Sequence, residues 1–90
     1  MRREGERLLL EGPVTLAVAA GMLVESEAFL ADGITVVDFS GVTTTDSAAL
    51  ALAVEWMRRS AASNRALKFS NLPESMRNMA KLYAVTELLS

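Results

Sequence analysis

The sequence predicts an α/β fold, in which a mixed four-stranded sheet with an antiparallel first hairpin is covered mainly on one face by three helices. Two observations lead to this prediction. Apolar runs of strand length alternate with apolar-periodic stretches of helix length, and the connections between them are short. Strand–helix–strand units with short connections form right-handed crossovers and therefore a largely parallel sheet. A length of 90 residues suits one core, so residues 1–90 are expected to form a single domain.

The central strand is expected over Ile34–Phe39, because near-continuous apolar character is typical of a strand that is buried on both faces. A polar hinge over Ser40–Thr45 follows, and a helix over Ser47–Ala62 comes next. Asp46 or Ser47 can cap that helix, since a short side-chain oxygen there accepts a hydrogen bond from a free backbone N–H. The hinge lies at the carboxyl end of the strand, where open α/β sheets usually place their functional groups.

A hairpin is expected before the first helix. The charged segment Arg2–Glu6 is expected to be a frayed lead-in, and Arg7–Glu11 to be the first strand. Gly12 and Pro13 would turn the chain, and a short second strand would continue from Val14. The hairpin would therefore place its turn at a Gly-Pro pair, both of which are common turn residues.

The first helix is expected over Leu16–Ala31, with Thr15 as its N-cap and Gly33 beyond its end. Glu27 falls within the apolar stripe, and we expect its carboxylate to reach water at the rim. A partner-facing acid is the alternative interpretation. The residues expected on the buried face are Leu16, Ala20, Leu23 and Leu30.

The second helix carries an apolar stripe and a tryptophan that lies off it. Trp56 is expected to pack partly over a neighbouring element, and an interface anchor is the alternative, because Trp is enriched at binding hot spots. The residues expected to form the buried stripe are Leu50, Val54, Met57 and Ala61, with Ala53 at its side.

The C-terminal part is expected to add a strand over Ala66–Ser70 and a third helix with Pro73 in its first turn. The apolar segment Val85–Leu89 is expected to dock on the body of the domain. The residues expected on the buried face of the third helix are Met76, Met79, Ala80 and Tyr83.

The composition excludes several classes of function. Nine basic against eleven acidic residues leave a net charge of -2, which argues against nucleic-acid binding. The absence of His and Cys removes disulfides, thiol nucleophiles, Ser-His-Asp triads and most zinc or iron sites. The acidic residues are scattered, and no glycine-rich phosphate loop is present. We therefore expect no enzyme, no cofactor and no metal site.

No segment is expected to insert into a membrane. The most apolar stretch, Val14–Val24, has about half of the ~20 residues that a spanning helix needs. A signal peptide is also not expected, because glutamates and the Gly12-Pro13 pair interrupt the early apolar residues. These features predict a cytoplasmic protein.

Two segments resemble the STAS domain family, which includes anti-sigma-factor antagonists and the cytoplasmic tails of sulfate transporters. The segment Val37–Val42 contains the Asp-x-Ser pattern, and Asp46–Leu50 resembles the Asp-Ser/Thr-small-Gly-Leu pattern that opens a helix. The segments Asn71–Ser75 and Met79–Val85 are similar to MlaB-type STAS proteins. These are the small cytoplasmic subunits of the Mla phospholipid-transport ABC complex of Gram-negative bacteria. The resemblance covers about Leu8 to Leu89.

The resemblance implies a non-catalytic subunit that binds and regulates the ATP-binding subunit of the transporter, an MlaF-type ATPase. Through this partner the chain would be peripheral to the inner membrane and would contact the permease indirectly. The transporter's task would be the maintenance of outer-membrane lipid asymmetry. In this interpretation Asp46 orders the turn and Ser47 presents its hydroxyl to the ATPase. The implied partner-binding residues are Thr44, Thr45, Asp46, Ser47, Ala48 and Ala51.

Three departures from the family pattern bear on this interpretation. Sigma regulators are phosphorylated at the position of Ala48, which has no hydroxyl here, and Ala49 replaces a common glycine. The first strand of many family members is missing or very short. The alternative function is an anti-sigma-factor antagonist that is switched by phosphorylation at Ser47. Capping alone would explain Asp46 and Ser47 but not the three successive threonines before them. Without a partner, the chain is expected to form a homodimer through the same face.

Overall fold

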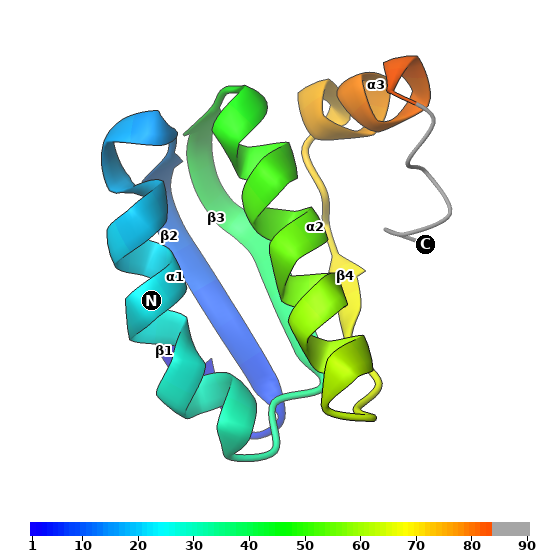
Figure 1. Cartoon of the computed structure of the whole chain (residues 1–90). Coiled ribbons are helices and arrows are strands. Elements are labelled where there is room, and N and C mark those ends of the chain that lie inside the picture. The colour runs from blue at the N-terminus through cyan, green and yellow to red at the C-terminus, as the bar shows by residue number, and fades with distance from the viewer. Residues whose placement is uncertain (84–90) are drawn as a thin grey trace.

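The computed structural model describes residues 1–83 and shows strands and helices in alternation (Figure 1). Along the chain the elements are β1 (Arg2–Glu4), β2 (Arg7–Val14), α1 (Leu16–Ala31), β3 (Val36–Thr45), α2 (Ser47–Ala62), β4 (Lys68–Ser70) and α3 (Glu74–Leu82). The strands form one sheet in the order β1-β2-β3-β4, with β1 antiparallel to β2 and the other neighbours parallel. The predicted α/β fold class, with its mixed four-stranded sheet and antiparallel first hairpin, is confirmed.

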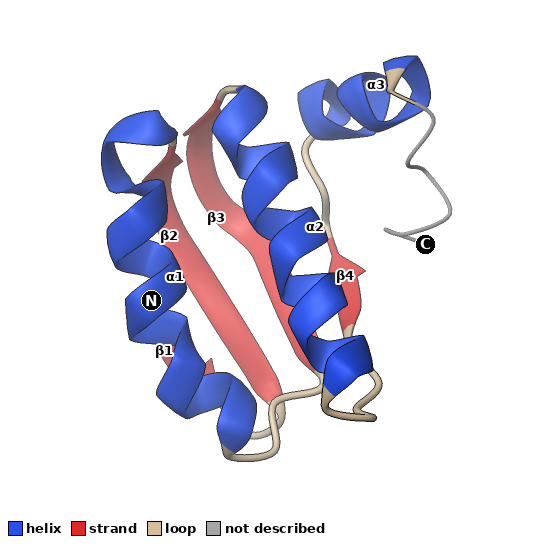
Figure 2. Ribbon diagram, viewed as in Figure 1, coloured by secondary structure: helices blue, strands red, loops and turns tan. Residues whose placement is uncertain are grey.

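Helices α1 and α2 lie side by side on one face of the sheet, and α3 lies near the start of α2 (Figure 2). The core fills the space between this face and the two helices. From the sheet it contains Leu8 and Leu10 of β2 and Val37 and Phe39 of β3, all of them buried. The carboxyl ends of β2 and β3 lie at one end of this layer, and the starts of α1 and α2 follow directly from them (Figure 1). That end of the sheet is where the candidate site lies.

The predicted position of the first hairpin was wrong. The antiparallel pair is β1 with β2, and the turn lies at Gly5, which has a positive φ of 61°. The expected turn at Gly12 and Pro13 lies instead inside β2. The register between β2 and β3 shifts between Gly12 and Pro13, so the positive φ of Gly12 and the missing N–H of Pro13 are accommodated as an irregularity. The expected lead-in Arg2–Glu6 therefore supplies the first strand.

The predicted hinge Ser40–Thr45 is also part of a strand, because β3 continues to Thr45. It continues because β2 runs alongside it as far as Val14 and provides backbone partners. This pairing depends on Gly41, where an added Cβ would lie only 2.6 Å from the carbonyl oxygen of Leu10. Only glycine allows the two backbones to approach so closely.

The prediction that Trp56 packs only partly was wrong, since its side chain is completely buried. Its indole N–H donates a 2.8 Å hydrogen bond to the Ser26 hydroxyl of α1, and its ring lies 6.4 Å from that of Phe69. The buried face of α2 is thus rotated relative to the predicted stripe. Of that stripe only Leu50 is buried, whereas Ala61 is exposed. The buried residues of α2 are Ala49, Leu50, Leu52, Ala53, Trp56 and Ser60.

The predicted buried face of α1 is only half right. Leu23 and Leu30 are partly buried and pack against the core, but Leu16 and Ala20 are exposed. The only fully buried residue of α1 is Ser26. Apolar side chains occur on nearly every side of this helix, so the periodicity does not distinguish the side that faces the sheet.

The expectations for Glu27, the third helix and the last strand are confirmed in part. Glu27 lies at the rim as predicted, where it pairs with Arg59 at 2.8 Å. The third helix buries Met76 and Ala80 as expected, but Tyr83 is 59% exposed because it lies at the end of the helix. The predicted strand over Ala66–Ser70 is shortened to β4. The expected docking of Val85–Leu89 lies outside the described residues.

Candidate functional site

The turn between β3 and α2 is organised by the carboxylate of Asp46. One carboxylate oxygen, Oδ1, accepts the N–H of Ala48 at 2.8 Å, which is the N-cap bond of α2. The other, Oδ2, accepts the N–H of Leu16 at 3.0 Å, at the start of α1. A single side chain therefore satisfies a free N–H at the beginning of both helices. The predicted N-cap of α1, Thr15, occupies the N-cap position, but its side chain makes no capping hydrogen bond.

The turn presents small side chains to solvent. Ser47 is exposed at the first position of α2, and Ala51 is exposed one turn later. Thr44 is exposed, and Ala48 is half-buried. No bulky side chain belongs to this set, so the surface allows another protein to approach the helix backbone closely. The positive end of the α2 dipole and the hydroxyl of Ser47 lie at this surface, and both favour polar or anionic groups of a partner.

The third helix contributes to the same edge, which the sequence did not indicate. The hydroxyl of Thr45 forms a 2.8 Å hydrogen bond with the hydroxyl of Ser75, 30 residues later. A shallow hollow of about 170 Å³ opens beside this bond, between the end of β3 and the start of α3. Its lining residues are Val42, Thr43, Thr44, Thr45, Pro73 and Ser75. The threonines at the end of β3 thus line one side of the hollow, and Pro73 and Ser75 at the start of α3 line the other.

A second polar group lies on the sheet, at Asp38 of the Asp-x-Ser pattern. Its buried carboxylate accepts hydrogen bonds from Arg7 at 2.9 Å, from the N–H of Ser40 at 2.8 Å and from Asn71 at 3.0 Å. Burial by itself would raise the pKa of Asp38, but the hydrogen bonds from Asn71 and Ser40 outweigh it and keep the pKa below its ordinary 3.8. Because all three donors come from different segments, Asp38 joins β2, β3 and the segment that leads to α3.

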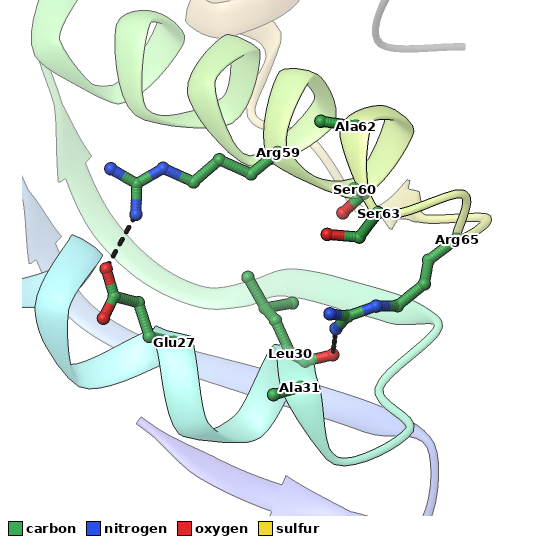
Figure 3. Close-up of a pocket in the computed structure, with 8 residues that line it drawn as sticks. All are labelled: Glu27, Leu30, Ala31, Arg59, Ser60, Ala62, Ser63 and Arg65. Carbon is green, nitrogen blue, oxygen red and sulfur yellow. Dashed lines mark hydrogen bonds and ion pairs between the residues drawn. The ribbon is translucent and has the colours of Figure 1, made fainter.

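A hollow of about 310 Å³ lies at the opposite end of the helical layer, between the last turns of α1 and α2 (Figure 3). Two arginines line it, but both are already engaged. Arg59 pairs with Glu27 at 2.8 Å and with Glu55 at 2.7 Å, and Arg65 donates to the carbonyl oxygen of Leu30. These contacts join the ends of the two helices. The charge of Arg59 is compensated by two carboxylates, and Arg65 is held by a backbone carbonyl, so both side chains serve the junction of the two helices.

The side chains at the turn are suited to binding another protein. They are hydroxyls, methyl groups and one carboxylate, and that carboxylate is occupied with two backbone N–H groups. Among residues 1–83 no group of three His, Cys, Asp or Glu side chains is placed to hold a metal ion. Nor is any helix within this range long and apolar enough to span a bilayer.

A protein-family model described as "Mlab, STAS domain" matches residues 1–90. A solved structure titled "Crystal Structure Analysis of Mglu" is similar to this chain, with a TM-score of 0.58 and 29% sequence identity. That match covers 81% of this chain but 19% of the solved chain, so the present sequence corresponds to a small part of the larger protein. No curated protein matches the sequence significantly.

Proposed function

This chain belongs to the MlaB-type STAS domain family, and on that premise we propose that it binds and regulates the ATP-binding subunit of an ABC transporter for phospholipids. In this proposal the chain is a non-catalytic, cytoplasmic subunit. It reaches the inner membrane through the ATPase, which in turn contacts the permease, and the complex serves outer-membrane lipid asymmetry. The MlaB-type family supports this role over that of the sigma regulators.

The observation that carries the proposal is the exposed hydroxyl of Ser47 on a turn that its neighbours hold in place. Asp46 bonds the first turns of both helices, and Thr45 bonds Ser75 of α3. A surface that is already ordered before binding loses little conformational entropy when a partner docks. The small side chains of Ala48 and Ala51 extend the surface along α2 without obstructing it.

The experiment is co-purification of this chain with the ATP-binding subunit encoded near its gene. We expect the wild type to be retained and Ser47→Arg to be lost, because the long side chain stands where the ATPase must approach. Ser63→Arg is the matched control, since Ser63 is an exposed serine that follows the other end of α2. Ala51→Arg should reduce binding as well, and it changes no residue of the turn.

Equal retention of Ser47→Arg, Ala51→Arg and the wild type would reject the proposed surface. Thermal unfolding of each variant shows whether a loss of binding reflects a loss of fold. Without the ATPase we expect the same face to pair with a second copy of the chain. In that case Ser47→Arg should shift the dimer to a monomer in light scattering.

The exposed hydroxyl of Ser47 also leaves a second function to be tested, the anti-sigma-factor antagonist that is switched by phosphorylation. A phosphate at the first position of α2 would be stabilised by the helix dipole. However, Ala48 has no hydroxyl, so Ser47 would have to take the phosphate in its place. Incubation with a cognate kinase and intact-mass measurement decides between the two functions. A mass gain that Ser47→Ala abolishes would favour the signalling function.

A further inference from the structure

Helix α1 exposes more apolar surface than its position in the fold explains. It lies at the outer flank of the helical layer, with α2 on its other side (Figure 1). Leu16 is 78% exposed and Val24 69%, and Val18 is also exposed. Apart from Ser26, the polar residues of this 16-residue helix are Glu25 and Glu27. A helix that is apolar on all sides is normally covered on all sides, so its outward face favours a contact with another molecule.

An open groove of about 470 Å³ runs beside this exposed surface, between α1 and the second half of β2, and Met1 also lines it. Most of its walls are apolar, and α1 contributes a glycine to them. A Cβ at Gly21 would meet no atom within 4 Å, so nothing in the fold itself requires glycine there. Glycine in the middle of a helix does, however, let another backbone approach closely. The lining residues are Met1, Glu11, Pro13, Ala17, Val18, Gly21, Met22 and Glu25.

The charges at the groove indicate what could fill it. Glu11 comes from the strand side and Glu25 from the helix side, and both are exposed. Glu11 makes a 3.5 Å contact with Arg2, whereas Glu25 has no ion-pair partner among residues 1–83. An apolar groove flanked by two carboxylates favours an apolar segment that carries Lys or Arg. A second copy suits it poorly, because two copies that met through this groove would bring the carboxylates of both their Glu11 and Glu25 side chains into one contact.

We propose that this groove binds an α-helix of another protein, with an apolar contact face and Lys or Arg residues along the edge that meets Glu11 and Glu25. Such a helix lies against α1 at Gly21 and covers Val18 with its apolar side chains. The groove does not include Ser47. The chain therefore has two docking surfaces, one at the start of α2 and one along the flank of α1, and each can be occupied without the other.

The test uses two synthetic helical peptides with the full-length chain. Both have the same Leu and Ala contact face, and their edge positions carry Lys in one peptide and Glu in the other. We expect the Lys peptide to shift the backbone amide signals of Glu11, Val18 and Gly21 in NMR spectra. The Glu peptide should bind about tenfold more weakly. In the double variant Glu11→Lys with Glu25→Lys this preference should be reversed.

Gly21→Leu supplies a control against misfolding. Its side chain fills the groove without meeting any atom near the Cβ position, and leucine favours the helix, so the variant should unfold at a higher temperature. Its affinity for the Lys peptide should nevertheless fall by about tenfold. Ser47→Arg should leave the affinity unchanged, which separates this proposal from the proposed function.

Three results would overturn the proposal. One is equal affinity for the Lys and Glu peptides, because Glu11 and Glu25 would then not contribute to the choice of partner. Another is unchanged binding by Gly21→Leu, since the peptide would then lie elsewhere. The third is a dimer of the free chain, seen by light scattering, that Gly21→Leu dissociates. In that case a second copy would be the occupant.

Discussion

Helices α1 and α2 have the same length and lie on the same face of the sheet, yet they are held by different forces. The inner face of α2 buries six residues around Trp56, and its outer surface carries the ion pairs of Glu55 with Arg58 and Arg59. Helix α1 fully buries Ser26 alone. Helix α1 is the more apolar of the two, so apolar character alone does not bury a helix, and its apolar residues must also be gathered on one side.

Polar contacts to α2 and its flanking residues add to the partial packing of α1 against the core. Asp46 bonds the first turn at Leu16, Trp56 bonds Ser26 near the middle, and Arg59 pairs with Glu27 in the last third. Each contact is made by α2 or by its N-cap residue. We infer that α1 is the less stable of the two helices, and that its open flank is available to a partner for the same reason.

The largest effect should come from removing the centre of the α2 packing. Trp56→Ala leaves a cavity and removes the hydrogen bond to Ser26, whose hydroxyl keeps only its bond to the carbonyl oxygen of Leu23. We therefore expect the free energy of unfolding to fall by about 3–5 kcal/mol. Val24→Ala is the matched truncation on α1. It should change stability by less than about 0.5 kcal/mol, because Val24 is mostly exposed. Urea unfolding followed by circular dichroism measures both. Similar losses would show that the two helices are equally anchored.

A smaller effect should follow from removing the cap that the two helices share. Asp46→Ala leaves the N–H groups of Leu16 and Ala48 without a protein acceptor, and should cost about 0.5–2 kcal/mol. Hydrogen exchange should then speed up in the first turns of both helices. Thr15→Ala removes no capping bond and should have little effect. Faster exchange in α2 alone would show that Leu16 does not depend on Asp46.

In contrast to these losses, a substitution of Gly21 in α1 should increase the stability of the chain. Gly21→Ala should stabilise the chain by up to about 1 kcal/mol, because alanine is the better helix former and its Cβ meets no other atom. The midpoint of thermal unfolding should rise accordingly. A fall in the midpoint would mean that the space beside Gly21 is already filled in the free protein.

The smallest effect should come from the charged outer face of α2. Hydrogen bonds from Arg58 and Arg59 lower the pKa of Glu55 from 4.5 to about 2. Since the folded pKa is the lower one, the stabilisation is present above pH 4.5 and disappears as the pH falls through about 2. Glu55→Gln should therefore flatten the fall of the unfolding temperature with pH in this window. If the unfolding temperature of Glu55→Gln fell with pH as it does in the wild type, the ion pairs would contribute nothing measurable to stability.

Several features of the candidate site could be predicted because they depend on neighbours in the sequence. The bond from Asp46 to the N–H of Ala48 spans two residues, so the capping pattern is sufficient to expect it. The second bond of Asp46 reaches Leu16, 30 residues away, and the bond between Thr45 and Ser75 spans the same separation. No local pattern contains these partners, because they meet only when α1 and α3 reach the carboxyl edge of the sheet.

The sequence alone determined the order and type of the main elements and the mixed sheet, and it limited the cap of α2 to Asp46 or Ser47. These follow from short-range periodicity, turn residues and side-chain chemistry. Only the tertiary structure decided that the hairpin turns at Gly5, that Trp56 faces inward and that the flank of α1 beside Gly21 stays open. Burial depends on which surfaces the neighbouring strands and helices supply. In a helix such as α1, which is apolar on nearly every side, the sequence does not indicate which side will be buried.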